Sequence, residues 1–161
     1  MTVPNIDEKF ISTFADATKE TLAVQCAYKV KYGKPFLRGK GKAIVPAIIG
    51  VIGISSPSFS GSISVAFTEK IFLELMGNML GEPFAEITEE LEDGVGELIN
   101  IIFGVVKKTL SQIGYQFHRA IPSVIRGNNI SVHSVSTKPV IIIPFFSETS
   151  PDTFQIEIVF E

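Results

Sequence analysis

The segment 89–110 constrains the fold most, because as a helix it would be apolar around most of its circumference. At about 100° per residue, its polar side chains fall within an arc of roughly 100°. The polar arc contains Asp93, Glu97, Asn100, Gly104, Lys107, Lys108 and Ser111, and the apolar remainder contains Val95, Leu98, Ile99, Ile102, Phe103, Val106, Leu110 and Ile113. Such a helix must be packed on most sides and open on one. We therefore expect chemistry or recognition along Glu97, Asn100 and Gly104.

Composition indicates one well-packed domain and argues against several kinds of partner. With 161 residues and 45% hydrophobic content, the chain can bury a sizeable core. A net charge of -3 and a pI near 5.5, without a cluster of Lys or Arg, predict neither a nucleic-acid nor a membrane-surface partner. The apolar run 43–54 is too short and too broken by Pro46, Gly50 and Gly53 to span a bilayer, so we expect a buried strand.

Cysteine usage and the first residues predict a cytoplasmic protein. The single Cys26 excludes an internal disulfide framework, which fits a reducing compartment. Cys26 itself is most simply a small buried hydrophobic residue. Residues 1–8 lack the basic end and apolar centre of a signal peptide.

Hydrophobic periodicity predicts helices between groups of strands. Apolar residues at helical spacing predict helices over 6–25 and 69–80, the second ending at Gly81. Thr88 offers an N-cap to the helix of 89–110, with acidic residues following it. Alternating or β-branched segments predict strands over 27–34, 42–54, 61–67, 129–136, 140–146 and 153–160.

An internal repeat relates the two halves of the chain. Residues 10–22 align with residues 98–110, and the match continues until Arg38-Gly39 lies opposite Arg126-Gly127. The matched pairs include Ile11 with Ile99, Lys19 with Lys107, Thr21 with Thr109, Leu22 with Leu110, Tyr28 with Tyr115, and Pro35 with Pro122. Chance similarity between two amphipathic helices followed by strands is the alternative explanation.

A duplication predicts the architecture of the domain. Two helix-then-strands units, about 6–67 and 89–160, would be linked by the helix 69–80 within a single domain of residues 1–161. The fold class is then α+β with two layers, in which two long helices pack on one face of a largely antiparallel sheet. In the first helix Lys9, Ser12 and Asp16 would stand where Glu97, Asn100 and Gly104 stand in the second. Only one copy would carry a site.

The spacing of Glu97 and Asn100 suits a site that positions water. The two residues are three apart on one helix face, so their Cβ atoms lie about 5–6 Å apart. An Asn amide has a donor and an acceptor and can hold a water, while Glu97 could act as a base or pair with a lysine of another protein. Gly104 invites close approach by another surface. Plain solvation of the two polar residues and helix packing at Gly104 are the alternatives.

Other catalytic schemes lack support in the sequence. His118 and His133 do not have metal-ligand spacing, so no metal site is expected in this chain. There is no G-x-S-x-G elbow, no Walker A sequence and no dinucleotide fingerprint.

The pattern D-x-x-G-E-x-x-N-x-x-x-G-x-x-K, from Asp93 to Lys107 on a mostly apolar helix, resembles the CheX branch of the CheC/CheX/FliY family of chemotaxis phosphatases. The likeness includes Gly50-Val51-Ile52-Gly53 and Pro122-Ser123-Val124-Ile125-Arg126-Gly127, and it covers almost the whole chain. Ile101 and Ile102 stand where methionine is common in relatives, a difference that concerns packing more than chemistry.

The resemblance implies hydrolysis of the aspartyl phosphate of a CheY-type response regulator. Asn100 would orient the attacking water, and Glu97 would pair with a lysine beside the phosphate. The resemblance also implies partner contacts at Asp93, Gly104 and Lys107. It implies Mg²⁺ on the phosphorylated regulator, no cofactor in this chain, and a homodimer formed through sheet edges.

Two other functions compete with this interpretation. A non-catalytic chemotaxis or flagellar-switch binding module would explain the open polar stripe without hydrolysis. A small-molecule sensor built on the duplicated unit would require a sizeable apolar cavity between helices and sheet.

Overall fold

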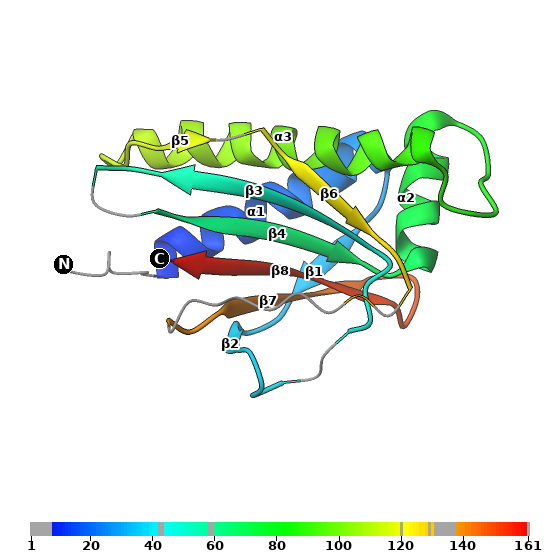
Figure 1. Ribbon diagram of the computed structural model, residues 1–161, viewed down its shortest axis with the longest axis horizontal. Coiled ribbons are helices and arrows are strands. Elements are labelled where there is room, and N and C mark those ends of the chain that lie inside the picture. Colours follow the sequence, from blue (N-terminus) through cyan, green and yellow to red (C-terminus); the bar gives the residue numbers. More distant parts are fainter. Residues whose placement is uncertain are drawn as a thin grey trace.

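The computed structural model describes residues 8–41, 44–57, 60–119, 121–128, 130 and 138–160. The helices are α1 (Glu8–Cys26), α2 (Glu69–Leu80) and α3 (Glu89–Ser111). The strands are β1 (Val30–Tyr32), β2 (Phe36–Leu37), β3 (Ile48–Ser55), β4 (Ser60–Phe67), β5 (His118–Arg119), β6 (Ser123–Arg126), β7 (Ile141–Ser147) and β8 (Thr153–Phe160). Figure 1 shows their arrangement in space.

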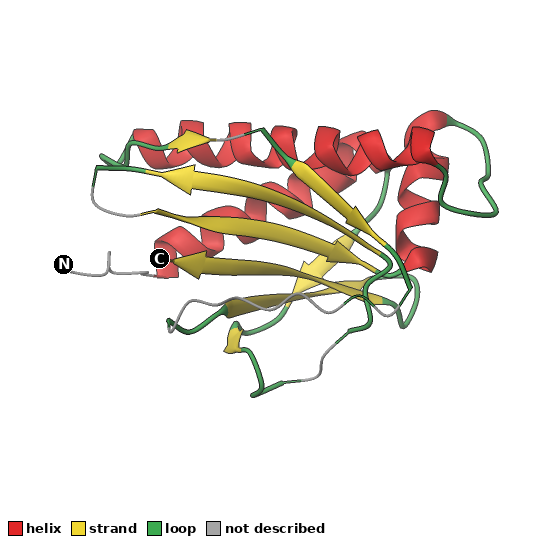
Figure 2. Ribbon diagram, viewed as in Figure 1, coloured by secondary structure: helices red, strands yellow, loops and turns green. Residues whose placement is uncertain are grey.

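The strands form one sheet with helices on one face. Its order is β1-β7-β8-β4-β3-β5, with β2 also on β7 and β6 also on β3, and every pairing among the described strands is antiparallel. The long helices α1 and α3 contact each other and lie behind the sheet in the view of Figure 2, with α2 at one end. This confirms the predicted two-layer α+β class.

The strand order treats the two halves of the chain alike. When β1 to β4 are exchanged with β5 to β8, the order β1-β7-β8-β4-β3-β5 becomes its own reverse, and the pairing of β2 with β7 becomes that of β6 with β3. Strands β4 and β8 meet at the centre. This pairing symmetry supports the duplication into units of about 6–67 and 89–160, which stays a prediction.

The core lies between the helices and one face of the sheet. Alternate side chains of β8, from Phe154 to Phe160, are at most 3% exposed, as expected for a strand with one buried face. The Phe154 ring stacks on Phe145 of β7 at a centroid distance of 4.8 Å and contacts Phe67 of β4 at 5.0 Å. These aromatic contacts join the central strands into a surface on which the helices pack.

Element bounds agree closely with the prediction for α2 and β8 but not for the strand expected over 42–54. Residues 42 and 43 of that range lie outside the described residues, and within the rest the strand begins at Ile48. Pro46 has no N–H to donate to a ladder, and Ala47 donates its N–H to the carbonyl of Phe67. The segment 27–34 is a strand only at Val30–Tyr32.

The short strands β2, β5 and β6 were not predicted. All four residues of β6 are exposed. The strand therefore lacks a buried face, and no alternation of apolar and polar residues marks it in the sequence. Of the strand expected over 129–136, all but Ile130 lies outside the described residues, and Ile130 is in no strand.

Candidate functional site

The start of α3 follows the predicted cap only in part. Thr88 is the N-cap, with extended backbone angles, but its side chain makes no capping hydrogen bond. Its backbone carbonyl accepts hydrogen bonds from the N–H groups of Leu91 at 3.0 Å and Glu92 at 3.3 Å. Carboxylates in the first turn, including Glu89, interact favourably with the positive end of the helix dipole. Backbone bonds and charge therefore stabilise this end of α3.

The face of α3 that was predicted to be apolar is buried against the sheet and α1. The buried residues of α3 are Leu91, Val95, Leu98, Ile99, Ile102, Phe103, Val106 and Leu110. Ile113, expected among them, is 50% exposed because the helix ends at Ser111.

Near the start of α3, glycines permit close approach. A Cβ on Gly50 of β3 would lie 3.1 Å from Val95 Cγ2, and a Cβ on Gly94 would overlap the sulfur of Met76 in α2.

The polar arc of α3 is open, as predicted. Asp93, Glu97, Gly104 and Lys107 are exposed, and Asn100 is half-buried between them. An added Cβ on Gly104 would have nothing within 4 Å, so intramolecular helix packing does not explain this glycine. The exposed helix face places a carboxylate and an amide one turn apart, beside bare backbone.

The corresponding face of α1 has different chemistry. Lys9 and Asp16 are exposed, and the Ser12 hydroxyl donates a hydrogen bond back to the Lys9 carbonyl at 3.2 Å. Tyr32 donates its hydroxyl to Asp16 Oδ1 at 2.7 Å, and this hydrogen bond raises the pKa of Tyr32. The first helix thus offers no Glu and Asn pair, which is consistent with a single site on α3.

Arg126 is a residue that the sequence reasoning did not assign to the site. Its Nε lies 2.6 Å from Glu92 Oε1 in the first turn of α3, and its Nη1 donates to the carbonyl of Ile87. The repeat aligned Arg126 with Arg38, but nothing in the charge pattern indicated Glu92 as its partner. Only the packing of β6 beside α3 brings these groups together.

Other predicted features lie away from α3. Cys26 is fully buried, which confirms its prediction as a small hydrophobic residue, and burial raises the pKa of its thiol to about 11. His118 is exposed on β5, and His133 is outside the described residues. Among the described residues, no group of three or more His, Cys, Asp or Glu side chains could hold a metal ion.

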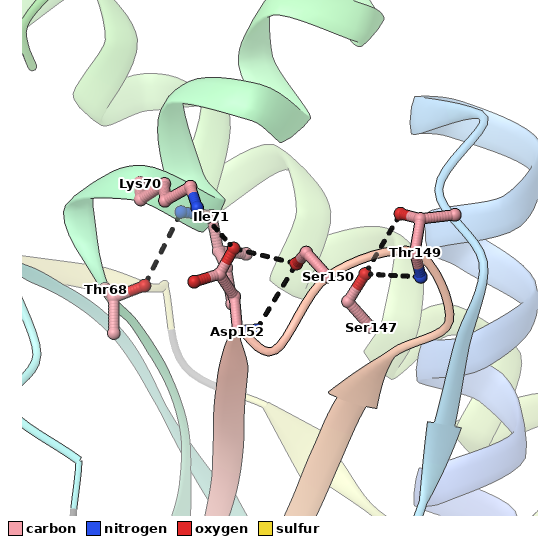
Figure 3. A network of polar contacts seen from close by, with 7 residues as sticks. All are labelled: Thr68, Lys70, Ile71, Ser147, Thr149, Ser150 and Asp152. Atoms are coloured by element: carbon pink, nitrogen blue, oxygen red, sulfur yellow. Dashed lines mark hydrogen bonds and ion pairs between the residues drawn. The ribbon is translucent and has the colours of Figure 1, made fainter.

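A polar network joins the start of β8 to the start of α2 (Figure 3). Ser150 donates to Asp152 Oδ2 at 2.7 Å, and Lys70 Nζ of α2 lies 3.2 Å from the same oxygen. These contacts lower the pKa of Asp152, the hydrogen bond from Ser150 contributing most. The network holds a helix end against a strand end and involves no residue of the polar arc.

Two surface hollows include residues of the loop between α2 and α3. One, of about 420 Å³, is lined by residues of α2 and the following loop, including Leu73 and Phe84. The other, of about 370 Å³, includes Glu86 and Arg126 in its lining. Neither is the cavity between helices and sheet that a small-molecule sensor would need. In the part of the chain that the structure describes, no helix is both long and apolar enough to cross a membrane.

The fold and the open arc define a class of protein: a two-layer α+β domain that presents a carboxylate and an amide on the outer side of a sheet-packed helix. Residues 48–146 match the family model described as chemotaxis phosphatase CheX. The chain belongs to the CheX family of chemotaxis phosphatases, a family of hydrolases, which confirms the resemblance drawn from the motif.

Individual relatives cover nearly the whole chain. A protein of Thermotoga maritima described as CheY-P phosphatase CheX is 24% identical over 148 residues, covering 91% of this chain and 94% of its own length. The structure of a CheC-like superfamily protein from Shewanella sp. PV-4 has 39% identity and a TM-score of 0.87, covering 96% of this chain and 99% of that one. CheX in the CheX-CheY-BeF3-Mg²⁺ complex of Borrelia burgdorferi has 23% identity and a TM-score of 0.79, covering 98% and 99%.

Proposed function

We propose that this protein accelerates hydrolysis of the aspartyl phosphate of a CheY-type response regulator. The observation that carries the proposal is the half-buried Asn100 between exposed Glu97 and Gly104, on the one open side of α3. The relative described as a CheY-P phosphatase and the CheX-CheY complex support this choice of substrate.

Asn100 is the residue suited to orient the attacking water. A partly buried amide is restricted in its rotamers, so its carbonyl oxygen can accept from a water while its NH₂ donates to a phosphoryl oxygen. Water attacks phosphorus, the bond between phosphorus and the aspartyl oxygen breaks, and the products are the free carboxylate and inorganic phosphate. The amide takes no proton; its contribution is geometry.

Glu97 is the residue suited to dock the regulator. It is exposed one turn before Asn100, and its carboxylate can pair with a lysine beside the phosphorylated aspartate. Asp93 and Lys107 extend the docking surface along α3, and the bare backbone at Gly104 lets the partner approach closely. These contacts exclude bulk solvent from the phosphoryl group and align that group with the single water held by Asn100.

The expected metal belongs to the regulator. The complex from Borrelia burgdorferi contains Mg²⁺ and BeF3 together with CheY. When bound there, Mg²⁺ neutralises charge on the phosphoryl oxygens. The residues of this chain would contribute only docking and the orientation of water.

An assay of phosphoryl decay tests the proposal. The regulator is phosphorylated by a small-molecule phosphodonor, and loss of the acyl phosphate is followed with and without this protein. Asn100→Ala should lower the stimulated rate roughly 100-fold, the scale of one well-placed group, with the fold unchanged by circular dichroism. Ser12→Ala, at the corresponding position of α1, should leave the rate unaltered. Full activity of Asn100→Ala would contradict the role of that residue.

The same assay distinguishes the docking role of Glu97 from the water-orienting role of Asn100. It also distinguishes an enzyme from a non-catalytic binding module. Glu97→Ala should raise KM for the regulator more than it lowers kcat, because the carboxylate acts in docking. A protein that binds the phosphorylated regulator but leaves its decay rate unchanged would instead be the chemotaxis or flagellar-switch binding module.

We also propose that the protein works in the cytoplasm as a homodimer joined through sheet edges. Strand β6 supports this, because it pairs only with β3 among the described strands and all its residues are exposed. Sedimentation at micromolar concentration should give twice the chain mass of 17.6 kDa, and a single-chain mass would contradict the dimer.

A further inference from the structure

Arg126 of β6 contacts both α3 and the loop that precedes α3, near the candidate site. Arg126 is the last residue of β6 and lies opposite Ile48 of β3, a core residue, so its side chain is on the helix-facing side of the sheet. It contacts the Glu92 carboxylate at 2.6 Å and donates to the carbonyl of Ile87. Both charged side chains are partly buried, with 39% of Arg126 and 28% of Glu92 exposed.

The contact adds a directional restraint to the apolar packing of α3. Near the start of α3, Val95 packs closely over Gly50, and Gly94 packs against Met76. Apolar contact of this kind is not directional, so it sets the depth of the helix better than its rotation. A guanidinium that donates to two acceptors in fixed directions does restrain rotation.

We infer that Arg126 is a positioning residue, which holds the first turns of α3 so that Asp93 and Glu97 face the docked regulator; this inference rests on the proposed function. Glu97 lies five residues beyond Glu92, or about 7.5 Å along the axis. Asn100 lies further on, where Ile99 is buried and anchors the helix independently. Loss of Arg126 therefore affects docking more than the hydrolytic step.

The first half of the chain provides a matched control. Arg38, which the repeat aligns with Arg126, pairs with Glu157 of β8. Glu157 lies opposite Ser64 and Ile142 and alternates with the core residues of β8, so this ion pair is on the sheet face away from the helices. Its removal eliminates an Arg–Glu ion pair without disturbing α3.

The test measures KM and kcat for stimulated dephosphorylation in four variants. Arg126→Gln and Glu92→Gln should each raise KM roughly three- to ten-fold and leave kcat within about two-fold, as expected for a partly buried charge pair. The double variant should be no worse than the worse single variant, because both remove the same contact. Arg38→Gln should leave both constants unchanged.

Hydrogen exchange provides a readout independent of activity. Amides of the first turns of α3 should exchange faster in Arg126→Gln than in Arg38→Gln or the wild type. An unchanged KM in Arg126→Gln, additive effects in the double variant, or unchanged exchange would overturn the inference while the wild type remains active. A wild type that does not stimulate decay would instead overturn the proposed function, and the inference with it.

Discussion

At the scale of single residues, Gly104 is a glycine that intramolecular packing does not require. A glycine inside a helix costs stability relative to alanine, and nothing lies within 4 Å of where its Cβ would be. The fold therefore does not require glycine at this position. Close approach by the regulator, as proposed above, would account for it, and that proposal can be tested without disturbing the core.

Gly104→Phe should keep the fold and lose the activity. The ring would project into open space beside Asn100, so the melting temperature should not fall, whereas stimulated dephosphorylation should drop roughly ten-fold or more because the partner is displaced. The matched control is Lys19→Phe on the exposed side of α1. Equal loss of activity in the control would show that the ring acts non-specifically.

At the scale of elements, helix ends were predictable where one residue determines them. The bounds of α2 were predicted from local sequence, and its C-cap Gly81 adopts φ 77°, a conformation that favours glycine. The strand β6 was missed because its edge position, not its own sequence, makes it a strand. Local rules therefore describe α2 better than β6.

Two glycine substitutions should have opposite effects on stability. Both Gly81 and Gly104 have open space where an added Cβ would lie, but only Gly81 has a positive φ. Gly81→Ala should therefore lower the free energy of unfolding by about 1 kcal/mol. Gly104→Ala should raise it by up to about 1 kcal/mol. Urea denaturation measures both, and a shift of the same sign in the two variants would contradict this explanation.

The junction between β8 and α2 should lose stability in acid. The pKa of Asp152 is below its ordinary value of 3.8, so the folded state holds the proton less tightly than the unfolded chain. The carboxylate thus stabilises the fold above pH 3.8, and this contribution disappears as the pH falls through the lowered pKa. The difference in unfolding free energy between wild type and Asp152→Asn should shrink over that range. A pH-independent difference would show that Asp152 has no such effect.

At the scale of the whole molecule, the sheet is built outward from two central strands. β4 and β8 pair with each other, and each pairs with a further strand on its other side. Most of their helix-facing side chains belong to the core. Strands β5 and β6 pair only with β3 within the described part of the chain. Local opening should therefore begin at the outer strands.

Hydrogen exchange should follow this order. Amides of β4 and β8 should exchange most slowly, through global unfolding, and amides of β6 should exchange faster, through local opening. Mass spectrometry of peptides from each strand measures the difference. Protection of β6 equal to that of β4 in the monomer would contradict the ordering, and added protection of β6 at high protein concentration would support an edge-to-edge dimer.

The sequence alone determined the open arc of α3, the extent of α2 and the two-layer class. The arc and the extent of α2 follow from the period of apolar residues and from local backbone preferences, which act over a few neighbouring positions. The two-layer class follows from the repeat of a helix-then-strands unit. Glu97 and Asn100 were found as site candidates in this way, because three residues of spacing on a helix fix which side chains share a face.

Only the tertiary structure decided which surfaces meet. The contact of Arg126 with Glu92, 34 positions apart in the chain, depends on β6 pairing with β3 beside α3. The short strands β2, β5 and β6 likewise exist because longer neighbours offer them hydrogen-bonding partners. Periodicity assigns a residue to a face, but long-range packing decides what lies against that face, since contacts between distant segments leave no periodic signal in either segment.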